Sequence, residues 1–254
     1  MSEVSKLFNN RSKTYDEIYG AINSKKLLYQ EKRVRSALVE EMISNELNLS
    51  DNHHIIDVGC GTGNFLLRIR KKGIKSPLLG VDISPEMIDK ARSNLQDSAF
   101  KDVEFRTGST ADINTRANLV LSLGVSGYSE NQNKFLEDLA DIVDQGGYLI
   151  FTTANGDSIF RNLRRFLSKL HSLLKSKTKS RGVEFQSIKE KTVDSLILTK
   201  KFSLERRVYI TFGLGLFRSS FECYVDRLLF RILKNNFLSK FLSLTTIHVY
   251  RKAS

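Results

Sequence analysis

The chain has 254 residues, with 40 Lys and Arg against 28 Asp and Glu, two Cys, two Pro and no Trp. This length and a hydrophobic fraction of 41% exclude a disordered chain and suit one large α/β domain or two small ones. Two cysteines cannot build a disulfide framework or a multi-cysteine zinc site, so we expect a reducing, cytoplasmic location and no metal. The first residues contain no run typical of a signal peptide, and no apolar stretch is long enough to span a membrane.

The basic excess is confined to the last two-fifths of the chain. Residues 1–156 carry 19 basic and 21 acidic side chains, whereas residues 157–254 carry 21 basic and 7 acidic ones. A surface of this kind is typical of proteins that bind nucleic acid or anionic lipid. A solvated lysine-rich surface explains the count equally well, so charge alone leaves these interpretations open.

Apolar residues recur at helical spacing in the first fifty residues, which predicts an N-terminal helical cap over residues 1–50. The short apolar run Ile55–Val58 then predicts a buried parallel strand. A helix is expected over Asn64–Lys72, with Gly73 as its stop signal.

The same strand–helix unit repeats through the next part of the chain. Leu78–Asp82 predicts a strand, and Ser84 followed by Pro85 is typical of a capped helix start. Further elements are expected as strands over 103–106, 118–123 and 148–152, with a helix over 135–143. This alternation predicts a doubly wound, mainly parallel sheet whose ligand site lies beyond the carboxyl ends of its strands.

The pattern after residue 152 is looser. A basic amphipathic helix is expected over 159–174, a second helical stretch over 217–242, and strands over 204–211 and 245–251 that pair antiparallel at the sheet edge. We therefore predict one domain over 1–254, built as a core over 51–155, a basic helical insertion over 156–203, and edge strands with an inserted helix over 204–254. The two helical stretches are expected to form a lid that lines an acceptor cavity.

The run Asp57-Val-Gly-Cys-Gly-Thr-Gly63 leaves the first strand and enters a helix, and its glycines let the main chain approach a ligand. The third glycine is one residue too early for the dinucleotide fingerprint, and no Gly-Lys-Ser/Thr follows for a nucleoside triphosphate. Asp57 before the loop suits a cationic ligand. Asp82 ends the next strand, where a carboxylate accepts hydrogen bonds from both ribose hydroxyls. Together these features predict a site for an adenosine with a positively charged tail and no phosphate.

These segments resemble the class I S-adenosylmethionine-dependent methyltransferases of the small-molecule type. Asp57–Gly63 is similar to their first motif, Val81–Met87 to their second, and Gln145–Ile150 to the turn before their fifth strand. The resemblance covers about residues 50–155. It implies a seven-stranded Rossmann-like sheet, methyl transfer, and S-adenosyl-L-methionine as the cofactor.

The resemblance also implies a role for individual residues. Asp57 would act near the cofactor's ammonium group and Asp82 at its ribose. Where many members carry an Asp after the third strand, this chain has Ser109, a weaker acceptor for the adenine amino group. The segment around Tyr15 resembles one that closes over the cofactor, although Tyr15 as a simple helix cap is the alternative. The full predicted cofactor set is Asp57, Gly59, Cys60, Gly61, Gly63, Asp82, Ile83, Met87, Ser109, Thr110, Ser122 and Tyr15.

No catalytic residue is assigned, because methyl transfer from a sulfonium depends mainly on positioning and exclusion of water. His53 and His54 precede the first strand, at the wrong end of the sheet, and His171 and His248 fall within a helix and a strand. Tyr128, Asn155 and Asp157 follow strands in the correct loops and are the only candidates.

The acceptor is expected to be small and apolar or lipid-linked, such as a quinone, polyketide or glycolipid precursor, with oxygen as the methylated atom. The helix over 159–174 has the pattern of helices that lie on anionic membranes, which predicts a peripheral membrane contact. The alternative is that the apolar faces of this helix and of the stretch over 217–242 pack on the sheet and on each other. Gly124–Tyr128 lacks the proline-rich run of base-amino methyltransferases, which makes nucleic acid an unfavoured partner. Two alternatives stay open: an RNA methyltransferase that uses the basic C-terminal part, and a non-catalytic binding module.

Overall fold

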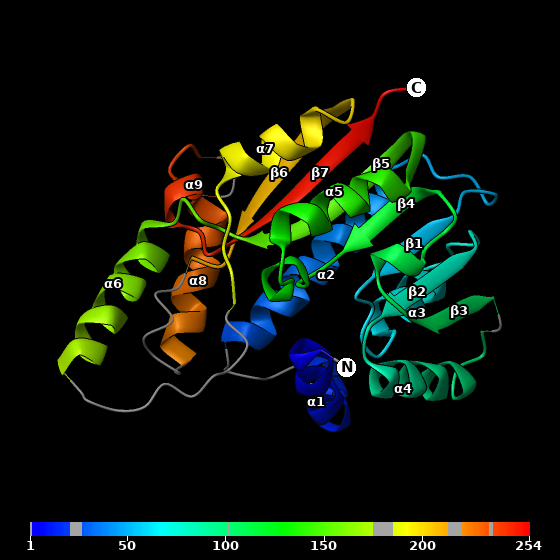
Figure 1. Cartoon of the computed structure of the whole chain (residues 1–254), viewed down its shortest axis with the longest axis horizontal. Coiled ribbons are helices and arrows are strands. Elements are labelled where there is room, and N and C mark those ends of the chain that lie inside the picture. The colour runs from blue at the N-terminus through cyan, green and yellow to red at the C-terminus, as the bar shows by residue number, and fades with distance from the viewer. Residues whose placement is uncertain (1, 21–26, 101, 175–184, 213–219, 234–235) are drawn as a thin grey trace.

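The computed structural model describes residues 2–20, 27–100, 102–174, 185–212, 220–233 and 236–254. Its sheet has the strand order β3-β2-β1-β4-β5-β7-β6 (Figure 1). The strands are β1 (Ile55–Val58), β2 (Leu78–Asp82), β3 (Val103–Thr107), β4 (Ala117–Ser122), β5 (Val143–Ala154), β6 (Phe202–Ile210) and β7 (Thr245–Lys252). The first five are parallel, and β7 pairs antiparallel with both β5 and β6. The predicted doubly wound, mainly parallel sheet and its antiparallel edge are confirmed.

Helices cover both faces of the sheet. They are α1 (Glu3–Gly20), α2 (Leu27–Asn45), α3 (Asn64–Lys71), α4 (Pro85–Gln96), α5 (Gln132–Ile142), α6 (Ile159–Leu174), α7 (Glu190–Leu198), α8 (Ser220–Leu233) and α9 (Ser239–Leu242). Two short 3₁₀ turns, Thr110–Asp112 and Ser126–Tyr128, follow β3 and β4.

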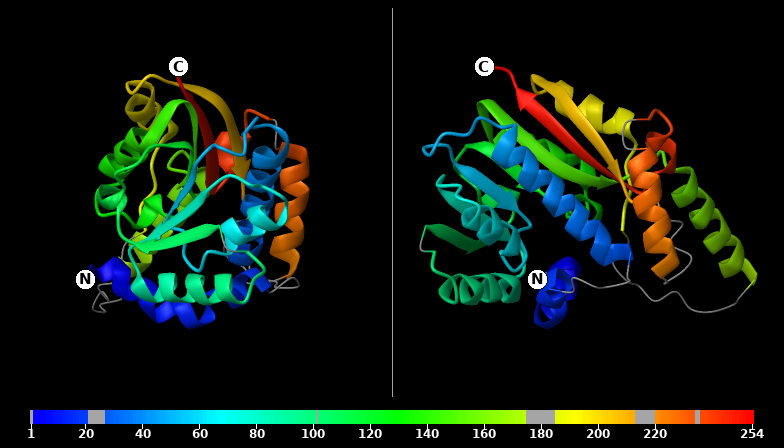
Figure 2. Two further views of the ribbon diagram at one scale, coloured as in Figure 1. Left: turned by 90° about the vertical axis from the view of Figure 1, so that its right-hand side faces the viewer. Right: turned by 180° about the vertical axis from the view of Figure 1, so that it is seen from behind.

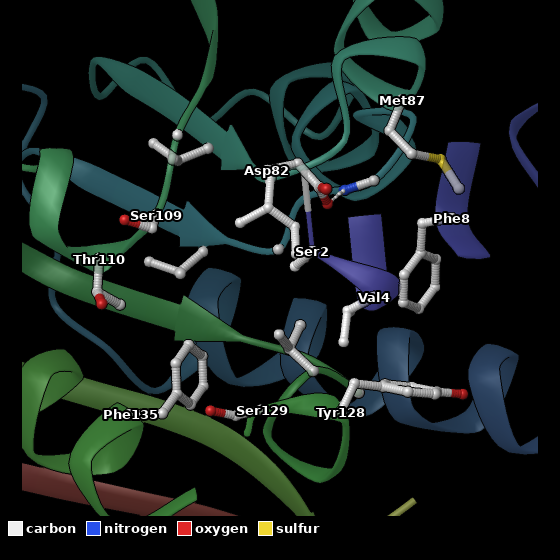
Figure 3. A pocket seen from close by; sticks show the side chains of 18 of the residues that line it. Ser2, Val4, Phe8, Asp82, Met87, Ser109, Thr110, Tyr128, Ser129 and Phe135 are labelled. Atoms are coloured by element: carbon white, nitrogen blue, oxygen red, sulfur yellow. Dashed lines mark hydrogen bonds between the residues drawn. The ribbon is translucent and has the colours of Figure 1, made fainter. Parts of the chain in front are cut away.

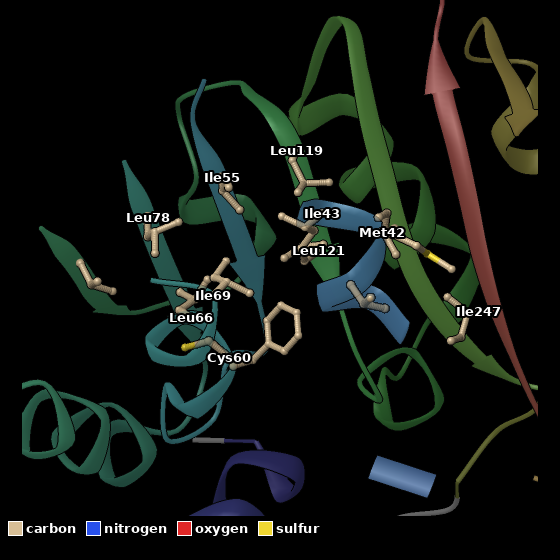
Figure 4. Packing of buried hydrophobic residues seen from close by; sticks show 14 of the residues in the cluster. Met42, Ile43, Ile55, Cys60, Leu66, Ile69, Leu78, Leu119, Leu121 and Ile247 are labelled. Atoms are coloured by element: carbon tan, nitrogen blue, oxygen red, sulfur yellow. The ribbon is translucent and has the colours of Figure 1, made fainter. Parts of the chain in front are cut away.

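The two apolar cores follow from the alternation of side chains along each strand. Ile55 packs on one face among residues of α2 and α3, such as Ile43 and Leu66 (Figure 4). Its neighbour Ile56 packs on the other face among residues of α5 and α7, such as Leu136. Burial on both faces explains why all four residues of β1 are buried and why three of them are apolar.

The secondary structure differs from the sequence prediction in several places. β5 begins at Val143, earlier than expected, and passes through Gly146, which has φ of 70°. Helix α7 was not predicted. The stretch over 217–242 contains α8 and α9, and its residues 217–219 and 234–235 lie outside the described part of the chain.

Helix α1 lies next to α4 at the carboxyl ends of the parallel strands (Figure 2). Ser5 Oγ on α1 donates to the carbonyl oxygen of Ile83 at 3.1 Å, just after β2. Ser84 Oγ, whose residue caps α4, donates to Asn9 Oδ1 on α1 at 2.6 Å. These hydrogen bonds fix the N-terminal helix over the edge of the sheet where ligands of this architecture bind.

Candidate active site

A cavity of about 390 Å³ opens at the carboxyl ends of β1, β2, β3 and β4 (Figure 3). Its walls come from α1, from the turns after β1 and β2, from the residues after β3, and from the segment between β4 and α5. The cavity therefore lies where the strand order reverses between β1 and β4, which is the ligand-binding crevice of open α/β sheets.

The polar wall of the cavity is organised by Asp82 at the end of β2. Its Oδ2 accepts a hydrogen bond from the N–H of Gly61 at 2.9 Å, and its Oδ1 accepts one from the N–H of Ser84 at 3.0 Å. Burial raises the pKa of Asp82, and these backbone hydrogen bonds act in the opposite direction. Each carboxylate oxygen keeps a further acceptor position, so Asp82 retains the capacity to bind two hydroxyl groups.

Asp57 lies beneath the glycine turn with only 3% of its surface exposed. Its Oδ1 has no hydrogen-bond partner. Burial and the nearby charge of Asp82 raise the pKa of Asp57 to about 7, against the opposing effect of Arg35. A buried carboxylate with an unsatisfied oxygen is costly, so this group is prepared for a positively charged or hydrogen-bond-donating ligand.

Arg35 on α2 carries a positive charge that acts on the carboxylate of Asp57. The residue is 4% exposed, its Nε has no hydrogen-bond partner, and its ion pair with Glu31 is long, at 3.9 Å. The guanidinium lies against the turn after β4, where a Cβ at Gly124 would come within 2.5 Å of Nη1. The positive φ of Gly124, 82°, likewise favours glycine there. The structure thus holds a buried, poorly paired cation beside the ends of β1 and β4.

The opposite wall of the cavity is apolar. Phe8 of α1 packs edge-on against Tyr128, with ring centroids 5.1 Å apart, and Tyr128 packs in turn against Phe185 at 4.8 Å. Val125 lies directly over the glycine turn, because a Cβ at Gly59 would come within 2.2 Å of its side chain. Leu123 and Phe135 complete this wall (Figure 3).

Residues 49–203 match a family described as a methyltransferase domain. This match covers more than half of the chain. The chain belongs to the class I S-adenosylmethionine-dependent methyltransferases.

Individual relatives show which parts are shared. A malonyl-[acyl-carrier protein] O-methyltransferase from Ilyobacter polytropus is 25% identical over 209 residues, which cover 80% of this chain and 71% of that enzyme. A 23S rRNA uracil-C5 methyltransferase from Shewanella sediminis is 35% identical over 85 residues, but these cover only 32% of this chain and 19% of that enzyme. The fold matches magnesium protoporphyrin IX methyltransferase from Synechocystis, crystallised with S-adenosylhomocysteine, with a TM-score of 0.68 at 17% identity over 95% of this chain and 94% of that one.

The site of this methyltransferase fits S-adenosylmethionine. That cofactor carries a ribose, an ammonium group and a carboxylate. In the cavity, the carboxylate of Asp82 can accept further hydrogen bonds. Next to the cavity, Asp57 Oδ1 and Arg35 Nε have no hydrogen-bond partner, and the ion pair of Arg35 with Glu31 is long.

The structure brings most of the predicted cofactor residues to the cavity wall, namely Tyr15, Gly59, Gly61, Asp82, Ile83, Met87, Ser109 and Thr110. Tyr15 lies over the glycine turn, since a Cβ at Gly61 would be 3.3 Å from its ring. Ser109 donates its hydroxyl hydrogen to Asp112 Oδ2 at 2.8 Å, which leaves its oxygen as an acceptor.

Four predicted residues do not line the cavity. Asp57 is buried below it, as described. The thiol of Cys60 packs in the core, where a Cβ at Gly80 would come within 2.8 Å of Sγ. Gly63 caps α3 and faces Phe105. Ser122 Oγ donates to the carbonyl oxygen of Val58 at 3.0 Å and ties β4 to β1.

The predictions for a lid and for loop residues need correction. Every described residue of the cavity wall precedes α5 or lies within it, so α1 covers the cavity and the helices over 156–254 do not line it. Tyr128 lines the cavity. Asn155 instead donates to the carbonyl oxygens of Lys240 and Ser243, and Asp157 accepts from the N–H of Glu190, so both are structural.

Sequence reasoning missed Arg35 and Phe8. Arg35 lies within a helix whose pattern predicted only packing, and no local motif marks it. For Phe8 the only signal is its place in the segment that contains Tyr15.

We predict that Asp82→Ala weakens S-adenosylmethionine binding roughly 100-fold, because the variant removes charge-assisted hydrogen bonds that are each worth about 1.5–3 kcal/mol. Isothermal titration calorimetry measures this loss. Asp89→Ala, which removes an exposed carboxylate from α4, is the matched control and should bind normally. Equal affinity in both variants would contradict the assignment of Asp82.

We predict that cofactor affinity falls as the pH drops through about 7. The raised pKa of Asp57 means that it is partly protonated near neutrality, whereas an ammonium ligand favours the ionised form. Affinity should therefore be constant above about pH 8 and fall by up to about tenfold per pH unit below 7. Calorimetry over this range with Asp57→Asn as the comparison tests the claim, since the cofactor affinity of this variant should not change with pH. A slope that persists in Asp57→Asn would exclude Asp57 as its source.

Proposed function

We propose that this methyltransferase methylates an oxygen atom of a small acceptor with an apolar body, free or linked to a carrier or lipid. The observation that supports the proposal is that the cavity has one polar wall and one apolar wall. One wall presents the glycine turn and Asp82, and the other presents Phe8, Val125 and Tyr128. An apolar acceptor body is stabilised by such a wall, whereas a nucleotide base with its phosphates gains little there.

A carboxylate is the acceptor oxygen that best fits the charges around the cavity. Burial, and to a smaller extent the charge of Arg35, lowers the pKa of Lys32 to about 8, against the opposing effect of Glu31. Lys32 Nζ lies 4.1 Å from the ring centroid of Tyr15, a residue of the cavity wall. The malonyl acceptor in the name of the Ilyobacter relative is also an acid, which supports the same choice.

The chain's own residues then act by binding and positioning. S-adenosylmethionine supplies an activated methyl group, and a carboxylate oxygen, ionised at neutral pH, accepts it without losing a proton. No histidine is among the described residues that line the cavity, and none is needed for such an acceptor. Asp82 would hold the ribose, Asp57 the ammonium and Arg35 the carboxylate of the cofactor. The α1 helix would exclude water through its hydrogen bonds to Ile83 and Ser84.

We predict that Arg35→Met removes the enzyme's preference for ligands that carry the cofactor's carboxylate. The wild type should bind S-adenosylmethionine at least about tenfold more tightly than its decarboxylated analogue, because a buried charged pair is worth more than 1.4 kcal/mol. In Arg35→Met the two ligands should bind equally. Calorimetry with both ligands measures this, and Arg33→Met, on an exposed part of the same helix, is the control.

The same experiment shows whether Arg35 binds the carboxylate of the cofactor or the carboxylate of the acceptor. If Arg35→Met keeps the wild-type preference but no longer methylates an acidic acceptor, Arg35 binds the acceptor and the cofactor assignment is wrong. The melting temperature of Arg35→Met is measured in parallel, because the variant also removes the positive charge that faces Asp57 and Glu31.

The reaction itself is tested by incubating the purified protein with methyl-labelled cofactor and malonyl thioesters or small apolar acids. We expect a product whose label is released as methanol by mild alkali, because a carboxylate methyl ester is the only one of the candidate products that hydrolyses in this way. Alkali-stable label in a lipid extract would leave O-methylation of a hydroxyl and exclude the carboxylate. Ribonuclease-sensitive label would instead establish the RNA alternative.

The partial match to an rRNA uracil-C5 methyltransferase does not favour that alternative. C5 methylation needs a cysteine nucleophile, and burial raises the pKa of the Cys60 thiol well above its ordinary value. Cys223 lies on α8, where its side chain is outside the described part of the structure.

A further inference from the structure

Helix α6 is attached to the body of the protein through Arg161. Arg161 Nη2 donates to the carbonyl oxygen of Leu244 at 2.6 Å, and burial lowers the pKa of Arg161. The N–H of the same residue donates to Ser158 Oγ at 3.3 Å. Among the described side chains of α6, Arg161 and the half-buried Phe160 are the ones that face the body of the protein.

The apolar face of α6 points to solvent. Ile159, Leu163, Phe166 and Leu167 recur at the spacing that places side chains on one face of a helix. All four are exposed, and Phe166 is 63% exposed. An amphipathic helix of a globular protein ordinarily buries this face against the core. Over its described side chains, α6 instead exposes this apolar face, together with Arg164 and Arg165.

Helix α8 also exposes apolar side chains, although its inner side packs on the core through Leu233 and Phe230. Asp226 faces inward and accepts a hydrogen bond from the N–H of Phe212 at 2.5 Å, and Leu233 is buried. Tyr224, Leu228 and Ile232, spaced four residues apart, are all exposed on the other side. Two neighbouring helices thus turn apolar side chains outward.

These exposed side chains gather at one end of the molecule. Figures 1 and 2 show α6, α8 and α9 together at the end opposite β3. Of the thirteen large apolar residues that are exposed in the described chain, nine lie here: the seven on α6 and α8, with Phe237 and Leu238 before α9. Single exposed apolar residues are ordinary on protein surfaces, whereas a concentration at one end marks an interaction site.

The charges beside this surface have one sign. Arg164 and Arg165 on α6, and Arg227 and Arg231 on α8, are exposed. Among the described side chains of the two helices, the only acidic one is Asp226, and it is buried. The surface therefore combines aliphatic and aromatic side chains with arginines and no exposed acid.

We propose that the outward faces of α6 and α8 dock onto an anionic lipid bilayer. The apolar side chains enter the boundary between headgroups and acyl chains, and the arginines contact the negatively charged headgroups. No helix in the described ranges is long and apolar enough to cross a membrane. In the proposed contact, α6 and α8 therefore lie on the membrane surface. An RNA partner would use the arginines but would leave Leu163, Leu228 and Ile232 without a partner.

The test is vesicle flotation with the full chain. We expect it to float with phosphatidylcholine vesicles that contain phosphatidylglycerol, less with phosphatidylcholine alone, and less as salt is raised. The double variant Leu163→Ser, Phe166→Ser should lower the bound fraction at least about tenfold with both vesicles. Arg164→Ala with Arg165→Ala should remove mainly the dependence on phosphatidylglycerol.

The matched control is Leu204→Ser, which removes an exposed leucine from β6 and should float like the wild type. An unchanged melting temperature and unchanged cofactor affinity show that the variants fold. No flotation at low salt would overturn the proposal, as would equal flotation of both serine variants. A dimer in light scattering that the α6 variant abolishes would also overturn it, in favour of a second copy. These results are independent of the test of the reaction, because none of the described residues of α6 and α8 lines the cavity.

Discussion

The site depends on the hydrogen bond between the carboxylate of Asp82 and the N–H of Gly61. β1 and β2 pair in parallel with Val58 beside Val81, so both strands end at the same edge of the sheet. The turn that leaves β1 then meets the acid that ends β2. This bond fixes the shape of the glycine turn and aims the remaining acceptor positions of Asp82 into the cavity, which makes the strand register the origin of the ligand site.

The same register places two acids close together in a buried setting. Burial raises the pKa values of both Asp57 and Asp82, and the charge of Asp82 raises that of Asp57 further. The N–H groups that Asp82 accepts and the guanidinium of Arg35 compensate part of this cost. The remaining cost of burying these charges would be offset by a bound ligand, since Asp57 Oδ1 and Arg35 Nε have no hydrogen-bond partners. One unpartnered acid and one poorly paired base suit the ammonium and the carboxylate of an amino-acid group.

The sequence predicted the features that depend on local chemistry. A glycine turn, a strand that ends in an acid, and the Ser84–Pro85 helix start each require particular residues at adjacent positions, and all three are present. Arg35 has no such signal, because its role arises only when α2 packs beneath a turn far along the chain. The lid was placed wrongly for a related reason. An amphipathic pattern shows that a helix has an apolar face, but not whether that face points to the core or to solvent.

The position of α1 links the two walls of the cavity. Ser5 and Asn9 bind the residues after β2, where the cofactor site lies, while Phe8 packs on Tyr128 in the acceptor wall. Tyr15, farther along the same helix, lies over the glycine turn. One helix therefore contributes to both walls of the cavity. If the apolar wall encloses the acceptor, as we propose, water exclusion and cofactor retention depend on the same contacts of α1.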